Sequence, residues 1–419
     1  MKIKPSKRIK GSITIPPDKS ISHRSLILTG MAKKPSTIRN ILESDDIKTS
    51  LNAMQKLGAH FSGNFSEMII TPFIEPTSSE LDCGNSGTTT RLIAGLVSSY
   101  KAQFDFIGDK SLSNRPMKRI SEPLTNMGSQ FIWKSKEGYL PYTIKGGQLR
   151  GIAFENKKRS AQVKSAILLA GLRADGRTIV YEKTKTRDHT ERLLQQMGAN
   201  ITIQNEKIEI QASELEGLTM TIPGDFSSAA FFLALTACHP NATLEIKNCS
   251  TNPSRTGLFE ILTKMGADIS LINEQHELEP YGDISVKSSQ LTGIQIPDQL
   301  IPNMIDELPL IAFLGCHAKG KTIVRNASEL RVKESDRIAI LCEMFKNIGI
   351  SITELEDGFE IEGPQTIHGG IVESHHDHRM AMLAAICGIL SQEGVQIKNH
   401  DCVSISFPSF FETLQTITC

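Results

Sequence analysis

The sequence predicts an α/β protein of two domains, each built from three repeats of helices and strands. Three observations lead to this prediction. The chain has 419 residues, more than one hydrophobic core ordinarily serves, so two domains are expected. A helix–glycine–strand signature recurs roughly every 70 residues. A second motif, Thr-Ile-Pro-x-Asp, occurs once near the N-terminus and once near the middle of the chain.

The recurring signature is the end of an amphipathic helix, a glycine and then a strand of alternating character. A glycine directly after a helix takes the left-handed conformation that leads the chain out of the helix. The glycines are Gly58, Gly128, Gly198, Gly266 and Gly349, and residues 410–418 form a truncated sixth copy. The spacing therefore predicts six units of similar size.

A second helix with a polar start and an apolar body precedes each signature. These helices are expected at residues 18–32, 85–99, 160–172, 225–237, 304–315 and 375–390. Because they are apolar on nearly all sides, we expect them to be buried. Short strands are expected after them, at residues 36–42, 177–183, 242–248, 321–327 and 395–401, and alternating strands at 207–212 and 358–363.

The Thr-Ile-Pro-x-Asp motif marks the expected domain boundaries. It begins at Thr14 and again at Thr221, and Pro or Gly interrupts the chain after both. We therefore expect one domain at Lys19–Pro223 and another formed by residues 1–18 with 224–419, whose N-terminal strand pairs with the second half. A solenoid scaffold is an alternative, but its binding face ordinarily varies, whereas these helix starts carry specific polar residues.

Composition excludes several classes of protein. Lys and Arg number 46, as do Asp and Glu, so no global positive charge drives nucleic-acid binding. The longest apolar run, Met380–Leu390, is shorter than a membrane span, and the N-terminus lacks the apolar stretch of a signal peptide. The eight cysteines, Cys419 among them, form no C-x-x-C pair. They are typical of buried thiols in a reducing compartment, so we expect a cytoplasmic protein. We also expect a monomer without nucleic-acid or membrane partners.

Reactive side chains concentrate at predicted helix starts, where free N–H groups and the helix dipole favour anions. The segments are residues 18–24, 84–88, 114–116, 160–162, 186–189, 333–337 and 377–379. Lys and Arg there oppose the dipole, which indicates an anionic ligand such as phosphate or carboxylate. Simple capping by residues 85–88, by Asp306 or by Glu334 stays open, as does a surface position for Arg115. We expect no metal at His375, His376 and His378 and no nucleotide cofactor, because the required spacings are absent.

Eight motifs, in order along the chain, resemble the 5-enolpyruvylshikimate-3-phosphate synthase family. They lie at residues 16–28, 85–96, 108–120, 160–172, 186–194, 305–312, 329–338 and 375–382, and the resemblance covers about residues 8–415. The resemblance implies an inverse α/β prism of two domains, with βαβαββ-type units and the active site in the cleft between them. It also implies transfer of the enolpyruvyl group of phosphoenolpyruvate to 3-phosphoshikimate in the shikimate pathway, toward chorismate and the aromatic amino acids, without a cofactor.

The resemblance also assigns roles to single residues. It implies that 3-phosphoshikimate is bound by Lys19, Ser20, Arg24, Ser160, Ala161, Gln162, Arg187, Asp306 and Lys333. It implies that phosphoenolpyruvate, and the inhibitor glyphosate in the same pocket, contact Lys19, Asn85, Gly87, Arg115, Gln162, Arg337 and Arg379. Asp306 is expected to be the base on the 5-hydroxyl, and Glu334 with Lys19 is expected to transfer the proton at C3 of phosphoenolpyruvate.

One position departs from the pattern of some family members. They carry a lysine two residues before the Phe-Pro pair near the C-terminus, where this chain has Ile405. This substitution and the 85–92 motif resemble the second class of the family. Two alternatives remain, a UDP-N-acetylglucosamine enolpyruvyl transferase and a non-catalytic phosphosugar-binding protein. The first begins its first motif with Lys-Asn rather than Lys19-Ser20 and uses a loop cysteine, whereas Cys83 lies outside that loop.

Overall fold

The computed structural model describes residues 1–418. The chain forms two compact units. The first unit is Pro17–Ile222, and the second unit combines Met1–Pro16 with residues 223–418. Each unit carries three small sheets and three buried helices, so the predicted α/β class with repeated units is confirmed.

The first unit contains three four-stranded sheets that share one topology. In each sheet the first and second strands pair in parallel, the second and third pair antiparallel, and the third and fourth also pair antiparallel. The strand orders are β14(Thr219–Thr221)-β3(Ser36–Arg39)-β5(Glu67–Thr71)-β4(His60–Gly63), β6(Ser79–Asp82)-β7(Gln103–Ile107)-β9(Tyr142–Lys145)-β8(Gln130–Trp133) and β10(Ala153–Glu155)-β11(Arg177–Tyr181)-β13(Lys207–Gln211)-β12(Ile201–Gln204). The first sheet therefore takes its first strand, β14, from the end of the unit.

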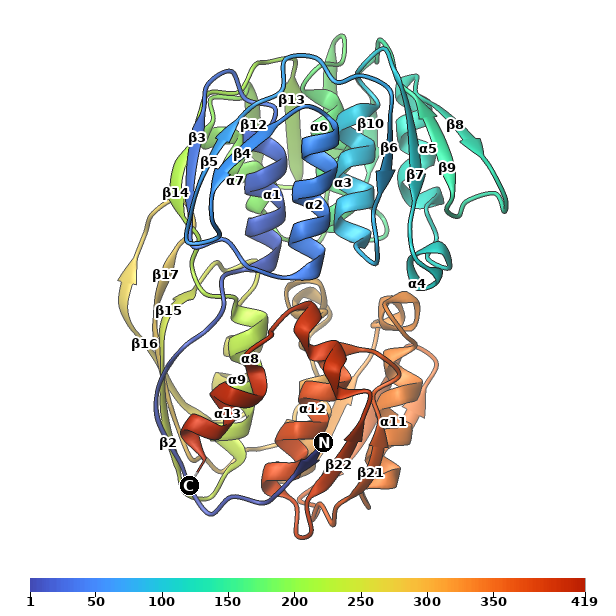
Figure 1. The fold of residues 1–419 in the computed structure, drawn as a ribbon. Coiled ribbons are helices and arrows are strands. Elements are labelled where there is room, and N and C mark those ends of the chain that lie inside the picture. Colours follow the sequence, from blue (N-terminus) through green and yellow to red (C-terminus); the bar gives the residue numbers. More distant parts are fainter. Residues whose placement is uncertain (419) are drawn as a thin grey trace. The chain divides into compact units, whose positions relative to one another are not determined.

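Most helices of this unit lie between its sheets, whereas the short helix after β7 lies beyond the end of that strand (Figure 1). The buried helices are α1(Lys19–Thr29), α3(Gly87–Val97) and α6(Ala161–Gly171), and the others are α2(Asp45–Lys56), α4(Lys110–Ser113), α5(Lys118–Met127) and α7(His189–Gln196). Helix α3 contacts both α1 and α6. A Cβ on Gly95 of α3 would lie 2.2 Å from the carbonyl oxygen of Ala166 in α6. Only glycine therefore permits this approach of the two helices, which brings their polar starts together.

The second unit repeats this plan, but two of its three sheets have three strands rather than four. Its sheets are β16(Asp268–Gln275)-β17(Tyr281–Lys287)-β15(Ala242–Ser250)-β2(Ile9–Thr14), β18(Gly320–Val324)-β20(Gly358–Gly363)-β19(Thr353–Leu355) and β1(Lys2–Ile3)-β22(Val395–Lys398)-β21(Gly370–Glu373). Strand β2 pairs in parallel with β15, and β1 pairs antiparallel with β22. In place of a regular first strand, the segment 292–295 makes two isolated bridges, to Lys319 and Ile323.

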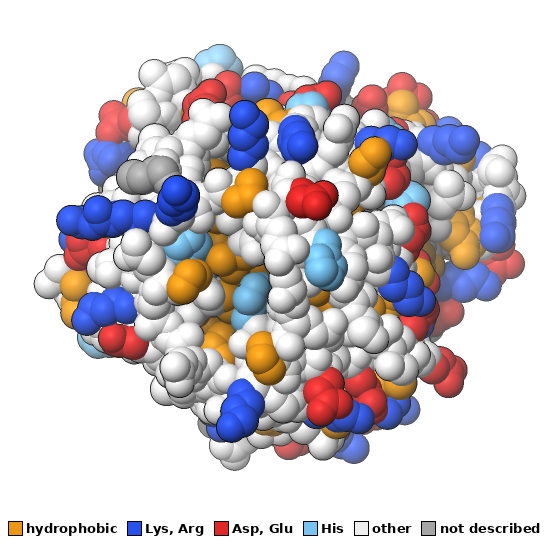
Figure 2. Space-filling model, turned by 90° about the horizontal axis from the view of Figure 1, so that it is seen from below, with side chains coloured by type: hydrophobic (Ala, Val, Ile, Leu, Met, Phe, Trp, Pro, Cys, Tyr) orange, Lys and Arg blue, Asp and Glu red, His pale blue; other side chains and the backbone are white. Residues whose placement is uncertain are grey.

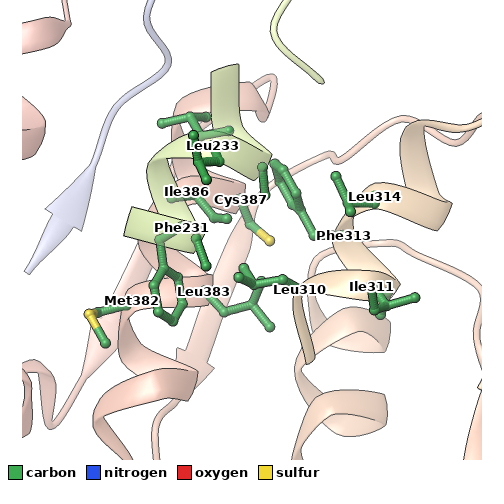
Figure 3. Close-up of a cluster of buried hydrophobic side chains, with 14 of the residues drawn as sticks. Phe231, Leu233, Leu310, Ile311, Phe313, Leu314, Met382, Leu383, Ile386 and Cys387 are labelled. Carbon is green, nitrogen blue, oxygen red and sulfur yellow. The ribbon is translucent and has the colours of Figure 1, made fainter. Parts of the chain in front are cut away.

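Three buried helices form the core of the second unit. They are α8(Phe226–Cys238), α10(Leu308–His317) and α12(His378–Leu390), and each contacts the other two. Figure 3 shows Phe231 of α8, Leu310 and Phe313 of α10, and Leu383 and Cys387 of α12 packed together. The remaining helices are α9(Gly257–Lys264), α11(Arg337–Asn347), α13(Phe410–Ile417), and the 3₁₀ helices η1(Asp298–Met304), η2(Ser328–Val332) and η3(His400–Ile405).

The structure confirms the role predicted for the recurring glycines. All five have positive φ angles, which are 103° at Gly58, 117° at Gly128, 79° at Gly198, 92° at Gly266 and 86° at Gly349. The predicted strands also form, although most end earlier than expected. Each glycine follows a helix and leads into the next segment, so the sequence signature marks a structural joint.

Two helices begin three or four residues later than predicted, whereas the other four buried helices begin within two residues of the predicted start. The helix expected at 304–315 starts at Leu308, because Pro309 occupies the first turn, the only turn in which proline does not break a helix. The helix expected at 375–390 starts at His378, because His375 and His376 have φ angles of 51° and 60°. The residues Asp306 and Asp377 therefore lie just before helices rather than inside them.

The surface and the cysteines complete the description. Figure 2 shows one face of the molecule, with Lys, Arg, Asp and Glu interspersed around its rim and hydrophobic and histidine side chains nearer its centre. Within residues 1–418, every cysteine is a free thiol; Cys238 and Cys402 are half-buried and the others are buried. Cys419 lies outside the described residues. No helix formed by residues 1–418 is both long enough and apolar enough to cross a membrane.

Candidate active site

The start of α1 carries three of the predicted site residues. The Asp18 carboxylate caps the helix and accepts from the Ile21 N–H at 2.9 Å. Lys19 is the first helical residue, and its Nζ lies 2.5 Å from Oδ2 of Asp46, at the start of α2. Ser20 follows, half-buried. A cation thus sits at the positive end of a helix, held there by a carboxylate that sequence reasoning did not identify.

Arg24 lies one turn further along α1 and is 3% exposed. Its guanidinium donates to the Thr190 hydroxyl at 2.8 Å, to the Ser165 hydroxyl at 3.1 Å and to the Ser20 carbonyl at 3.0 Å. These partners come from α7, α6 and α1. The three helices therefore fix the direction of one buried guanidinium through neutral oxygens.

A second guanidinium, that of Arg115 between α4 and α5, is oriented by Asn85, which lies just before α3. Arg115 is 8% exposed, and its Nη2 donates to Oδ1 of Asn85 at 2.7 Å. The amide nitrogen of Asn85 donates in turn to Oδ2 of Asp109 at 2.6 Å. The structure thus brings together two of the predicted residues that are 30 positions apart in the sequence.

Gly87, the first residue of α3, faces two guanidinium groups. A Cβ at this position would lie 3.0 Å from Nη1 of Arg91 and 3.3 Å from Nη1 of Arg115. The φ angle of Gly87 is not in the left-handed region that requires glycine. The missing side chain therefore leaves room beside Arg91 and Arg115, and it is not required by the backbone conformation at the start of the helix.

The start of α6 contributes a third group of polar residues. Ser160 caps the helix, accepting from the Val163 N–H at 3.4 Å, and Ala161 is the first helical residue. The Gln162 amide nitrogen donates to the Thr88 hydroxyl at 2.9 Å, and its oxygen accepts from Nη1 of Arg91. The starts of α3 and α6 are thereby joined side chain to side chain.

Arg187 is the remaining predicted residue of the first unit. It is half-buried in the segment between β11 and α7. Thr186, next to it, is buried and donates its hydroxyl to Glu182 at 2.7 Å. The segment that carries Arg187 is therefore anchored to the end of β11.

The predicted residues of the second unit surround Arg337, whose side chain is 1% exposed. The Arg337 Nε donates to Oδ2 of Asp377 at 2.8 Å, and its Nη2 donates to Glu334 at 2.7 Å. Its Nη1 donates to Asp306 at 3.3 Å. Burial lowers the pKa of Arg337, but the charges of Asp377, Glu334 and Asp306 raise it by more, so the group stays charged.

Asp306 is the point where the cations of this unit meet. Its Oδ1 accepts from Lys333 Nζ at 3.3 Å, and its Oδ2 lies 3.8 Å from Nη2 of Arg379. Asp306 is 13% exposed, Lys333 26% and Glu334 30%, so these side chains remain accessible while Arg337 is enclosed. Asp306, Lys333, Glu334, Arg337 and Arg379 thus form a single cluster, as far as the described residues extend.

Sequence reasoning assigned no role to three further charged residues that hold these groups. Asp377 caps α12, is fully buried and pairs with Arg337. Arg331 donates to Asp336 at 2.8 Å and to the Glu356 and Leu355 carbonyls at 2.7 Å, which anchors the segment carrying Lys333. For Arg91, a signal existed: it follows Gly87 by four residues, the spacing that places two residues on one helix face.

Ile405 ends η3 and is half-buried. Its aliphatic side chain supplies no cation, unlike the lysine expected there in part of the family. Among residues 1–418, no three His, Cys, Asp or Glu side chains are grouped so as to hold a metal ion.

Comparisons with known proteins extend over the whole chain. The family model described as EPSP synthase (3-phosphoshikimate 1-carboxyvinyltransferase) matches residues 3–414. A 3-phosphoshikimate 1-carboxyvinyltransferase from Thermotoga neapolitana is 49% identical over 100% of this chain and 99% of its own length. The solved EPSP synthase from Acinetobacter baumannii has a TM-score of 0.88 and 40% identity, covering 100% of this chain and 98% of that one. The enolpyruvyl transferase NikO from Streptomyces tendae, 15% identical with a TM-score of 0.81 over 99% of this chain and 96% of that one, shares the fold.

Proposed function

The chain belongs to the EPSP synthase family, and from this premise we propose that the two groups of polar residues described above act together on one pair of substrates. The enzyme transfers the enolpyruvyl group of phosphoenolpyruvate to the 5-hydroxyl of 3-phosphoshikimate and releases phosphate, a step of aromatic amino-acid biosynthesis. The observation that carries the residue assignment is the collection of buried or half-buried cations at helix starts in both units.

Charge explains why so many cations are needed. Each substrate carries a phosphate and a carboxylate, so the two repel one another in water. We assign 3-phosphoshikimate to Lys19, Ser20, Arg24, Ser160, Ala161, Gln162, Arg187, Asp306 and Lys333, and phosphoenolpyruvate to Lys19, Asn85, Gly87, Arg115, Gln162, Arg337 and Arg379. Holding both substrates converts a bimolecular step into an effectively unimolecular one, which is worth up to about 7–11 kcal/mol.

The chemistry consists of an addition followed by an elimination. The 5-hydroxyl attacks C2 of phosphoenolpyruvate while C3 gains a proton, and the tetrahedral intermediate then loses phosphate and a C3 proton. Asp306 is the proposed base for the hydroxyl, because its carboxylate is partly exposed and held by Lys333 and Arg337. Glu334, with Lys19, is the proposed pair for proton transfer at C3. General acid–base groups of this kind contribute roughly 10²–10⁴-fold each.

Finer properties follow as further proposals. We infer that the protein works in the cytoplasm, because free thiols such as Cys83 and Cys316 suit a reducing compartment. We also propose a monomer and, since Lys plus Arg balance Asp plus Glu at 46 each, a protein without a nucleic-acid partner. Light scattering of the purified protein measures its oligomeric state, and a filter-binding assay at low salt measures nucleic-acid binding.

A phosphate-release assay tests the function. Phosphate is expected only when phosphoenolpyruvate and 3-phosphoshikimate are both present, together with a product whose mass equals their sum minus phosphate. UDP-N-acetylglucosamine in place of 3-phosphoshikimate is the control and should release none. Well-folded protein that releases no phosphate with both substrates, or that prefers the UDP-sugar, would contradict the proposal.

A further inference from the structure

The first unit contains a buried ion cluster whose charged residues have no role in the proposed reaction. Lys164, in the second turn of α6, is 1% exposed. Its Nζ lies 2.7 Å from Oε2 of Glu182 and 2.6 Å from Oε1 of Glu191, and both carboxylates are 3% exposed. It also donates to the Thr186 carbonyl at 3.4 Å. One ammonium therefore joins the end of β11, the start of α7 and the middle of α6.

Glu182 extends the cluster to the start of α6. It accepts from the amide nitrogen of Asn156 and from the Thr186 hydroxyl, both at 2.7 Å. The Asn156 side chain also bonds both backbone groups of Ser160: it accepts from the N–H at 3.1 Å and donates to the carbonyl at 3.2 Å. The segments that present Ser160 and Arg187 are thus fixed by the same carboxylate.

The neighbours of Lys164 and Glu191 in sequence hold Arg24. Ser165 follows Lys164, and Thr190 precedes Glu191. Their hydroxyl oxygens are 2.7 Å apart, and both accept from the Arg24 guanidinium. The distance between α6 and α7, and with it the direction of Arg24, therefore depends on the ion cluster.

Charge makes Lys164 the critical member. Burial lowers the pKa of Lys164, but the charges of Glu191 and Glu182 raise it by more, so the side chain is an ammonium. Burial raises the pKa of Glu191, and Lys164 is the cation that opposes this shift. Without this ammonium, the two buried carboxylates would either repel one another or take up a proton, and in both cases the ionic link between the end of β11, α7 and α6 would be lost.

We propose that Lys164 is a positioning residue for the 3-phosphoshikimate part of the site, acting through Glu182 and Glu191 on Ser160, Arg187 and Arg24. The inference rests on the proposed roles of those three residues. None of the cluster's hydrogen bonds described above reaches Arg115 or Gly87. Loss of Lys164 should therefore affect one substrate more than the other.

The test is Lys164→Met, which keeps length and removes the charge. We expect the KM for 3-phosphoshikimate to rise about 10- to 100-fold, the range for a lost charge-assisted hydrogen bond, while the KM for phosphoenolpyruvate stays within about twofold. Lys183→Met is the matched control, because Lys183 is 81% exposed and pairs only loosely with Glu155 at 3.7 Å. It should change neither constant. Equal rises in both KM values for Lys164→Met would overturn the proposal.

A second variant covers the case in which Lys164→Met does not fold. Glu191→Gln keeps the pair between Lys164 and Glu182 and removes one carboxylate. It should raise the KM for 3-phosphoshikimate about threefold and leave that for phosphoenolpyruvate unchanged. Adding Glu191→Gln to Lys164→Met should restore part of the lost affinity, because the repulsion is gone. An unaltered 3-phosphoshikimate KM in Glu191→Gln, or no restoration in the double variant, would contradict the role.

Arg24→Ala separates this proposal from the function on which it rests. It should raise the KM for 3-phosphoshikimate at least tenfold. If Arg24→Ala does so and Lys164→Met does not, the positioning role fails and the proposed site stands. If Arg24→Ala leaves the KM for 3-phosphoshikimate unchanged, the assignment of Arg24 itself is wrong.

Discussion

Within each unit, the guanidinium groups of the proposed site form hydrogen bonds to a different kind of partner. In the first unit, Arg24 donates to hydroxyl and carbonyl oxygens, and Arg91 and Arg115 donate to the side-chain amides of Gln162 and Asn85. In the second unit, Arg337 donates to three carboxylates, those of Asp306, Glu334 and Asp377. In both units these guanidinium groups lie near the start of a helix.

This difference indicates a division of work between the units. A neutral oxygen fixes the direction of a guanidinium without offsetting its charge, whereas a carboxylate both orients and offsets the charge. The first unit is thus suited to binding phosphate and carboxylate groups. The second unit holds carboxylates among cations, as proton transfer requires. Lys19, which pairs with Asp46, is the member of the first unit closest in character to the second.

The largest expected effect comes from removing the proposed base of the second unit. Asp306→Asn keeps the shape and most hydrogen bonds but cannot take the hydroxyl proton. We expect kcat to fall about 10³-fold, while the Kd for 3-phosphoshikimate, measured by titration calorimetry, changes only a few-fold. Asp298→Asn, at an exposed position of η1, is the control. Turnover near the parent rate would remove Asp306 from the base role and weaken the contrast between the units.

The next effect is on stability and concerns Asp377, which is fully buried against Arg337. Asp377→Asn leaves a buried guanidinium without its fully buried charge partner, so the free energy of unfolding in urea should fall by about 3 kcal/mol. Asp401→Asn, at an exposed position, should leave it unchanged.

The pH dependence of the same pair has a definite sign. Burial raises the pKa of Asp377, but the charge of Arg337, its hydrogen bond to Asp377 and the charge of His378 together lower it by more, so the net direction is downward from 3.8. A lowered folded-state pKa stabilises the protein above the unfolded value, and this stabilisation is lost as the pH falls through the folded value. The parent should therefore lose more unfolding free energy than Asp377→Asn between pH 5 and about pH 3. Parallel curves would show that the pair does not titrate as described.

A third substitution makes the first unit resemble the second. Gln162→Glu places a carboxylate beside Arg91, in contact with Thr88. We expect the KM for phosphoenolpyruvate to rise roughly 30-fold, since an anion then meets a like charge at the site. Gln195→Glu, on the exposed face of α7, is the matched control. If Gln162→Glu binds phosphoenolpyruvate as well as the parent does, the neutral partners of the arginines do not explain anion binding by the first unit.

The smallest effect is expected at Gly87. Gly87→Ala places a methyl group 3.0 Å from the guanidinium of Arg91 and 3.3 Å from that of Arg115, so one or both must shift. The KM for phosphoenolpyruvate should rise about threefold, and the inhibition constant of glyphosate, a slightly longer ligand, about tenfold or more. Steady-state kinetics with and without glyphosate measure both. An unchanged ratio of the two constants would mean that Gly87 does not limit the ligand's length.

Local features of the fold were predictable from the sequence because they depend on neighbouring residues. The joints at Gly58 and Gly266 follow from helix periodicity ending at a glycine, and the buried helices follow from their apolar character. The partners of the site residues were not predictable in this way. Thr190 is 166 positions from Arg24, and Asp377 is 40 positions from Arg337, so only the folded repeats bring them together.

Resemblance to a family supplied the candidate residues that patterns alone left open. It named Asp306 and Arg115, for which helix capping or surface exposure were equally reasonable from the sequence. It did not name Lys164 or Arg331. Neither residue is assigned to a substrate, and each holds other residues of the site in place. Such supporting residues are visible only as bonds between distant segments, as between Lys164 and Glu182.

The borrowed strands impose an order on how the protein forms during synthesis. The first unit is completed by β14, so all of its strands have been made once residue 222 leaves the ribosome. Strands β1 and β2 are made first of all, yet their partners β22 and β15 come much later. Since domains fold as units while the chain is synthesised, residues 1–16 remain unpaired while the first unit folds. Their final pairing, of β1 with β22, joins the earliest and nearly the latest residues to be translated.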